Sequence, residues 1–148
     1  GDDDLILHKI VTQTDWDIKY INSKESLVYS DPPKTLNEFF LQRLRWASKG
    51  LLYYKINSPK EVKVILPFLY LINILCVVSI IEFIHSGFIF YMIPIFIKCI
   101  ADFILLAKYF KKLDIRIKII YLTILSIIHP FYVVLLGGLG PFLKYKWK

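Results

Sequence analysis

Long apolar runs constrain this chain more than any other feature. Residues 64–107 contain only three charged side chains, which are Glu82, Lys98 and Asp102. A helix needs about 20 predominantly apolar residues to cross the hydrocarbon core of a bilayer. The runs predicted to cross are 64–85, 88–107 and 119–136. With a mean hydropathy of +0.52, the chain is predicted to be neither a purely soluble globule nor a disordered segment.

The first two runs are joined by a short polar turn, whereas the third contains a helix breaker. The sequence His85-Ser86-Gly87 predicts a helical hairpin. In the third run Pro130 removes a backbone donor and crowds the preceding turn. We therefore expect a kinked or broken helix there, loosened further by Gly137, Gly138 and Gly140. A full crossing and a re-entrant bend both fit, and they place the C-terminus on opposite sides.

The net charge of +7 comes from basic residues beside the apolar runs. The basic clusters are Lys108, Lys111, Lys112, Arg116 and Lys118, and then Lys144, Lys146 and Lys148. Such clusters set the orientation of membrane proteins and contact anionic headgroups, which disfavours nucleic acid as a partner. The positive-inside rule predicts that residues 1–63 and the loop 108–118 face the cytoplasm and that the turn at 86–87 faces outside.

The remaining local signals are modest. The two cysteines, Cys76 and Cys99, lie in apolar runs without a metal-binding or disulfide pattern, so we expect inert core thiols. No signal segment opens the chain, which starts with Gly1, and we expect it to begin inside a longer protein.

The polar N-terminal part is predicted to contain two helices and one strand. Residues 1–15 place apolar side chains after an acidic cluster and fit a short helix. The β-branched and aromatic stretch 26–30, which stops at a Pro-Pro pair, fits a strand. Thr35 followed by Glu38 forms a capping-box pattern that predicts a helix over 36–51.

The predicted helix 36–51 separates its side chains by chemistry. At 100° per residue, one side is apolar and is expected to be buried. Its members are Leu36, Phe40, Leu44, Ala47 and Leu51. The opposite side is polar, aromatic and cationic within an arc of about 100°. Its members are Gln42, Arg45, Trp46 and Lys49.

Two motifs and their order resemble a known enzyme family. The chain opens on Gly1-Asp2-Asp3-Asp4-Leu5, and the pentad Gln42-Arg43-Leu44-Arg45-Trp46 precedes the apolar runs. This arrangement resembles the C-terminal part of membrane-integrated family 2 glycosyltransferases, which include the cellulose, chitin, hyaluronan and poly-N-acetylglucosamine synthases. The Q-x-x-R-W pentad is the specific element. The lead-in 30–35 and the final Lys146-Trp147-Lys148 also fit bacterial members.

The resemblance implies a mainly α-helical membrane protein with a catalytic remnant. Residues 1–60 would be the C-terminal part of a cytoplasmic α/β catalytic domain (Rossmann-like, glycosyltransferase type A), with 36–51 as an interface helix. Residues 61–148 would form a transmembrane domain of about three helices. The nucleotide-binding half, including a D-x-D motif that holds a divalent metal (Mg or Mn), would lie upstream of Gly1, so the fragment is expected to be inactive alone.

The resemblance also implies roles for individual residues. Asp3 matches the family's general base, which takes a proton from the acceptor hydroxyl, and Asp2 and Asp4 flank it. Asp2 replaces the more frequent Glu. Gln42 and Arg45 match residues near the donor diphosphate, and Trp46 matches the platform for the acceptor sugar. Arg43 lies within the same pentad, and the resemblance implies that Asp2, Asp4 and Arg43 also belong to the donor and acceptor site.

The implied function is inverting transfer of a sugar from a nucleotide-activated donor to a glycan or lipid-linked acceptor. The chemistry is compatible, because a carboxylate can deprotonate the hydroxyl, a guanidinium can stabilise the departing diphosphate, and an indole stacks on a sugar. The expected location is the cytoplasmic (inner) membrane, as a multi-pass protein with its catalytic part facing the cytoplasm. The expected role is polysaccharide biosynthesis.

Less specific interpretations remain beside these. Aspartates before an apolar run often cap a helix, and an Arg-Trp pair beside a membrane often serves as an anchor. Lys98 and Asp102 lie inside a span at an i, i+4 spacing and are expected to pair with each other. The alternative function is therefore a non-catalytic membrane protein, such as a small transporter subunit or an assembly scaffold, that uses Lys98 and Asp102.

Overall fold

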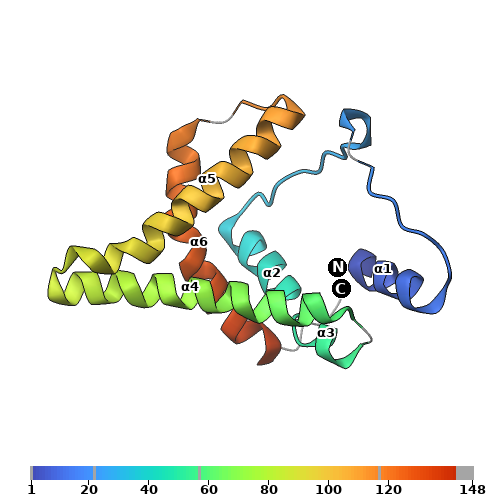
Figure 1. The fold of residues 1–148 in the computed structure, drawn as a ribbon, viewed down its shortest axis with the longest axis horizontal. Coiled ribbons are helices and arrows are strands. Elements are labelled where there is room, and N and C mark those ends of the chain that lie inside the picture. The colour runs from blue at the N-terminus through green and yellow to red at the C-terminus, as the bar shows by residue number, and fades with distance from the viewer. Residues whose placement is uncertain (1, 22, 57, 117, 143–148) are drawn as a thin grey trace. The chain divides into compact units, whose positions relative to one another are not determined.

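The computed structural model describes residues 2–21, 23–56, 58–116 and 118–142, and for residues 2–5 and 24 it describes the backbone alone. Helices dominate the described chain (Figure 1). The α-helices are α1 (Asp2–Gln13), α2 (Leu36–Ala47), α3 (Leu52–Lys55), α4 (Lys60–Ser86), α5 (Ile93–Leu113) and α6 (Ile119–Leu139). The short 3₁₀ turns are η1 (Lys24–Ser26), η2 (Ile89–Met92) and η3 (Gly140–Phe142).

The chain forms two compact units. One contains the described residues up to Pro67 together with those from Leu136 onward, and the other contains residues 68–135. The first unit carries the polar helices α1, α2 and α3. The second carries most of α4 and α6 and all of α5.

The predicted strand at 26–30 is wrong. Ser26 ends the turn η1, and residues 27–30 have no regular secondary structure. Val28 is 91% and Tyr29 84% exposed. A strand requires a neighbour with which to exchange backbone hydrogen bonds, and the described residues contain no other strand that could serve as one.

Helix α2 begins as its capping pattern predicts and ends earlier than expected. The backbone N–H of Glu38 donates to Thr35 Oγ1 at 3.1 Å, and the Glu38 carboxylate accepts from the N–H of Lys34 at 2.8 Å. At the other end, Ser48 Oγ donates to the Arg45 carbonyl at 2.8 Å. A serine hydroxyl that bonds to a backbone carbonyl competes with the backbone N–H groups of the helix and so weakens it. The helix therefore stops at Ala47 rather than near residue 51.

The side of α2 that was expected to be buried is only partly covered. No residue of the helix is fully buried, and Leu36 is 76% exposed. Ala47 is a covered position on this side. It lies so close to Gly140 of η3 that a Cβ added to residue 140 would be 2.5 Å from the Ala47 Cβ. Glycine is required at position 140 because only hydrogen fits this approach.

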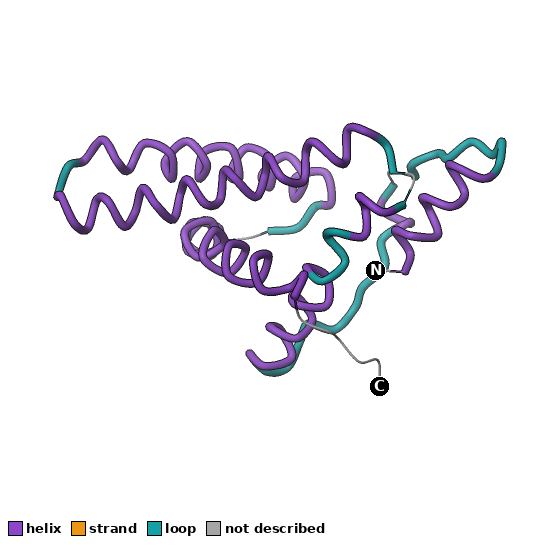
Figure 2. The backbone as a smooth tube through the Cα atoms, turned by 90° about the horizontal axis from the view of Figure 1, so that it is seen from below, coloured by secondary structure: helices purple, strands orange, loops and turns teal. Residues whose placement is uncertain are grey.

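The three predicted spans are confirmed as helices, and each is longer than its apolar run. The helical segments long and apolar enough to cross a membrane are Lys60–Ser86, Ile89–Leu113 and Ile119–Phe142. These segments indicate a multi-pass membrane protein. Near the turn at Gly87 (φ 69°), α4 and the segment leading into α5 form a hairpin, as Figures 1 and 2 show.

The predicted loop 108–118 is shorter than expected. Helix α5 continues through the first three lysines and ends at Leu113, and the following Asp114 adopts the left-handed conformation (φ 59°). Lys111 and Lys112 lie in the last turn, where cations interact favourably with the helix dipole. The loop is therefore confined to the residues from Asp114 up to the start of α6.

Helix α6 continues through Pro130, so of the expected kink or break the break does not occur. Pro130 lies inside the helix with less than 2% of its surface exposed. Pro67 also interrupts the backbone hydrogen bonds of a helix, because it lies within α4, on an exposed position, and cannot donate to the carbonyl of Lys63. That carbonyl instead accepts a hydrogen bond from the Tyr54 hydroxyl at 2.8 Å. Neighbouring groups can thus replace the backbone bond that a proline removes.

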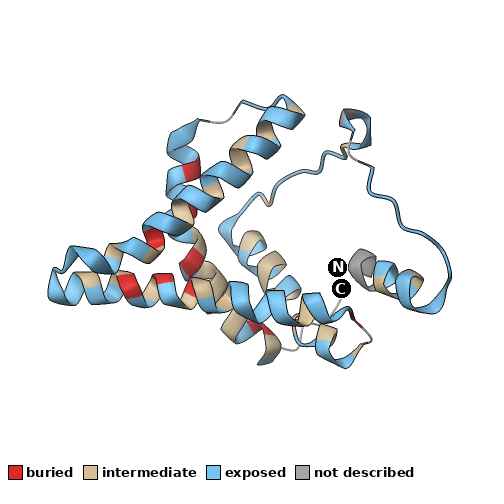
Figure 3. Cartoon of the chain, in the orientation of Figure 1, coloured by how far each residue is buried: buried red, intermediate tan, exposed pale blue. Residues whose placement is uncertain are grey.

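Most large apolar side chains of α4, α5 and α6 remain exposed, and buried positions form small patches (Figure 3). The buried residues of α4 follow a three-residue step and are small or polar; they are Asn73, Cys76 and Ser79. Small residues at such spacing allow close helix packing in membranes. The Tyr70 hydroxyl adds a link from α4 to α6, because it donates to the Val134 carbonyl at 3.0 Å.

Candidate functional site

A groove of about 540 Å³ runs along α2 from the segment that precedes the helix to Arg45 in its last turn. Its helical wall includes Gln42 and Arg45 from the pentad, which share one side because they are three residues apart. The residues lining its other wall come from the extended segment before the helix, namely Asp31, Pro32, Pro33 and Lys34. The groove is shallow and largely open to solvent.

The local sequence explains why the groove forms. Two consecutive prolines keep residues 31–34 out of helical conformation, and Thr35 then starts the helix as its N-cap. The hydrogen bond from the Lys34 N–H to Glu38 holds the extended segment against the first turn. The same capping interaction that starts the helix therefore also fixes the two walls relative to each other.

The groove carries charges of both signs. Lys34 and Arg45 are its cations, and Asp31 and Glu38 are its carboxylates. The Glu38 carboxylate is already engaged at the helix N-terminus. Arg45 provides a planar array of donors that matches phosphate or carboxylate oxygens.

The other two polar members of the pentad lie outside the groove lining. The Arg43 guanidinium stacks over the Trp46 ring at 4.4 Å from its centroid and over the Phe39 ring at 4.9 Å. These are distances at which cation–π attraction operates. Trp46 is nevertheless 45% exposed. The pentad therefore has two faces, with Gln42 and Arg45 on the groove and Arg43 and Trp46 in a stack.

The acidic residues Asp2, Asp3 and Asp4 form the first turn of α1, which confirms the helix predicted at the N-terminus. Their side chains lie outside the described part of the structure. Further along α1, His8 packs edge-on against Tyr53 of α3, with ring centroids 5.5 Å apart. The roles that the resemblance implies require Asp3 to meet Arg45 and Trp46 in one site, and this stays a prediction.

Among the residues that the structure describes, no three His, Cys, Asp or Glu side chains lie close enough to hold a metal ion. The prediction that places metal ligands upstream of Gly1 is untested by this observation.

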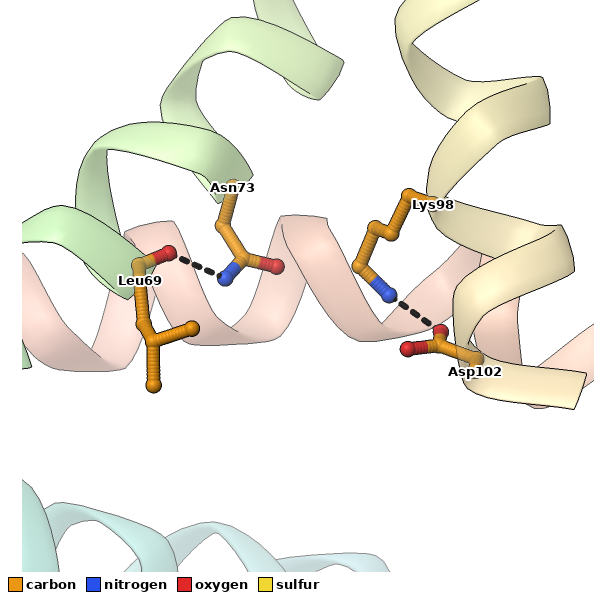
Figure 4. A network of polar contacts seen from close by, with 4 residues as sticks. All are labelled: Leu69, Asn73, Lys98 and Asp102. Carbon is orange, nitrogen blue, oxygen red and sulfur yellow. Dashed lines mark hydrogen bonds and ion pairs between the residues drawn. The ribbon is translucent and has the colours of Figure 1, made fainter. Parts of the chain in front are cut away.

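A second polar group lies inside the membrane-spanning helices. Lys98 and Asp102 form the expected ion pair within α5, with Nζ and Oδ2 2.5 Å apart and side chains 9% and 31% exposed (Figure 4). Asn73 of α4 faces the same region and donates through Nδ2 to the Leu69 carbonyl at 2.7 Å. Asn73 in α4 and Lys34 in the groove are not among the functional-site residues predicted from the sequence. A lone amide inside an apolar run was the available signal for Asn73.

Comparisons of the chain with protein-family models, with curated proteins and with solved structures find no match.

Proposed function

We propose that the chain is the C-terminal part of a membrane-integrated, inverting family 2 glycosyltransferase. Its catalytic part would face the cytoplasm at the inner membrane, and its product would be a cell-surface or exported glycan. The proposal expects a nucleotide-binding α/β half upstream of Gly1, and residues 1–60 would complete that domain.

The observation that carries the proposal is the groove on α2. Within the pentad, Gln42 and Arg45 line it, and Lys34 stands on the facing wall. Sugar transfer from a nucleoside diphosphate leaves a diphosphate whose negative charge must be stabilised as the bond to the sugar breaks. A guanidinium and an ammonium beside a neutral amide supply donors for those oxygens.

The reaction follows from the proposed roles. The Asp3 carboxylate accepts the proton of the acceptor hydroxyl, whose oxygen attacks the anomeric carbon of the donor sugar. The bond from that carbon to the diphosphate breaks on the opposite face, which inverts the configuration. Trp46 offers an exposed indole for the acceptor sugar. A divalent metal held upstream would add charge stabilisation to the diphosphate.

The test compares two arginines on the same helix in the protein that carries this chain behind its nucleotide-binding half. Arg45→Ala should weaken binding of the nucleoside diphosphate at least tenfold, because it removes a charge-assisted hydrogen-bond donor. Arg43→Ala removes the same charge outside the groove and should change affinity less than threefold. Equal losses in both variants, or none in Arg45→Ala, contradict the donor site.

The assigned base has a separate test. Asp3→Asn should abolish transfer from a radiolabelled nucleotide sugar to membrane-extracted acceptor, while nucleotide affinity changes less than threefold. Unchanged turnover in this variant would reject Asp3 as the base.

The second candidate function is a non-catalytic membrane protein centred on Lys98 and Asp102. Their ion pair inside α5 favours it, because charges within membrane spans often mark functional sites. This candidate predicts that uncharged replacements at Lys98 and Asp102 abolish function and that Asp3 and Arg45 tolerate change. The enzyme proposal predicts that changes at Asp3 and Arg45 abolish function. It predicts that uncharged replacements at Lys98 and Asp102 are tolerated.

A further inference from the structure

A cavity of about 510 Å³ lies between α4, α5 and α6, within the unit formed by residues 68–135. Most of its lining is aliphatic, and its polar lining consists of Asn73, Lys98, Asp102 and His129. A second cavity of about 220 Å³ shares Asp102 and His129 with it and adds Ser126. The polar groups of three helices thus gather at one place inside otherwise apolar walls.

Asn73 has an atom whose bonding capacity is unused. The residue is only 7% exposed, and its Nδ2 is occupied by the Leu69 carbonyl. No donor among the described residues bonds to Asn73 Oδ1, which is buried. Figure 4 shows this oxygen directed into the space between α4 and α5 where the Lys98 side chain also lies. A buried acceptor without a donor costs free energy that a suitable ligand would recover.

The position and charge of the site restrict the ligand. Asn73 is at the centre of α4, thirteen residues from each end, so the site lies deep in the expected hydrocarbon region. Lys98 and Asp102 already neutralise each other, and a further charge at this depth would be costly. The ligand must therefore be uncharged, must offer a hydrogen-bond donor to Asn73 Oδ1, and must fill aliphatic walls with an apolar body.

The lipid phase gives access to such a molecule. Leu69, Leu75 and Ile97 line the cavity and are 50%, 55% and 60% exposed. They belong to the faces of α4 and α5 that would contact lipid tails. An entrance through aliphatic side chains admits a lipid chain more readily than a water-soluble metabolite.

We propose that this cavity binds an uncharged membrane lipid that carries a hydroxyl group, with the hydroxyl donating to Asn73 Oδ1 and the alkyl chain lying between α4 and α5. The site is independent of the groove on α2, and its test does not depend on the outcome of the glycosyltransferase proposal.

The experiment uses the 148-residue chain in phosphatidylcholine nanodiscs and a hexadecanol probe that carries a diazirine in its chain. Illumination should attach the probe to the cavity-lining residues of α4 and α5, as mapped by mass spectrometry. Unlabelled hexadecanol should compete at a concentration about tenfold lower than hexadecyl methyl ether, because the ether keeps the oxygen but lacks the donor.

Three variants identify the acceptor. Asn73→Leu should raise the concentration at which hexadecanol competes with the probe about tenfold. In this variant hexadecanol and hexadecyl methyl ether should compete at the same concentration. Ala101→Phe retains the polar groups but fills the cavity, so it should abolish labelling even where Asn73→Leu fails to fold. Ser79→Ala is the control, because Ser79 is buried on the same helix and outside both cavity linings.

Two results would overturn the site. One is equal competition by the alcohol and the ether in the unmodified chain. The other is labelling spread over the apolar surface that persists in folded Ala101→Phe protein, as judged by circular dichroism.

Discussion

Several polar side chains within the spans bond to groups of their own helix. Ser79 Oγ donates to the Leu75 carbonyl at 2.6 Å, and Lys98 pairs with Asp102 one turn away. With no water in the hydrocarbon region, local partners are the nearest available ones. Spacing along the sequence therefore predicts these contacts well, as it does for Lys98 and Asp102.

Breaking the ion pair from one side should be more harmful than removing it. Lys98→Met leaves the Asp102 carboxylate without its partner, and we expect a loss of roughly 3 kcal/mol in the free energy of unfolding. Combining Lys98→Met with Asp102→Leu should recover more than half of that loss. Unfolding in mixed detergent micelles measures both values. A double variant as unstable as the single one would show that charge pairing is not the cause.

The Tyr54 hydroxyl should stabilise the chain only because Pro67 is in α4. Tyr54→Phe is expected to cost about 1 kcal/mol, since it removes the donor to the Lys63 carbonyl. In a Pro67→Ala background the alanine N–H can donate to that carbonyl, so the same substitution should cost much less. A double-mutant cycle of thermal unfolding measures the coupling. Equal costs in both backgrounds would refute the explanation.

At the scale of elements, neighbouring residues determine where α2 starts, whereas the end of α2 also involves residues far away in the sequence. The Thr35 cap places the start of α2 at the predicted residue, because the hydroxyl and the N–H it accepts from are three residues apart. The end at Ala47 depends on the turn that follows and coincides with the contact to Gly140, almost a hundred residues away in sequence. Such a contact leaves no periodic signal in either segment.

The contact between α2 and η3 should fail when Gly140 gains a side chain. Its Cβ would lie 2.5 Å from the Ala47 Cβ and 2.7 Å from the Ala47 carbonyl carbon. Gly140→Ala should therefore destabilise the chain by about 1 to 3 kcal/mol, the usual cost of overpacking. Thermal unfolding is the measurement. Adding Ala47→Gly should restore part of the loss, and a Gly140→Ala chain as stable as the unmodified one would contradict this packing.

At the scale of the whole molecule, the apolar spans dominate. Three helical segments of 27, 25 and 24 residues meet the length and hydropathy of membrane crossings. Their exposed apolar side chains are explained if lipid covers them. The placement of the turn at 86–87 outside and of the loop after Asp114 in the cytoplasm depends on the basic residues and stays a prediction.

The orientation can be measured by labelling from one side of the membrane. With Cys76 and Cys99 replaced by alanine, a single cysteine at Ser86 should react with an impermeant maleimide from the outside. A single cysteine at Arg116 should react only after the membrane is opened, because α5 has 21 residues and spans about 30 Å. Reaction of both positions from the same side would rule out α5 as a crossing.

The sequence by itself determined the number and approximate bounds of the membrane helices, the start of α2 and the Lys98–Asp102 pair. Each depends on composition or on groups within four residues of one another, where helix geometry sets the distance. Of the kink or break expected at Pro130 the break does not occur, and the strand expected at residues 26–30 is wrong. Both outcomes depend on neighbouring segments.

Only the tertiary structure decided which polar residues share a site. It placed Gln42 and Arg45 on a groove with Lys34 and moved Arg43 and Trp46 into a stack. It also gathered Asn73, Lys98 and His129 from three helices around one cavity. Packing between segments far apart in sequence sets these neighbours, and that packing depends on side-chain shapes that no periodic pattern encodes.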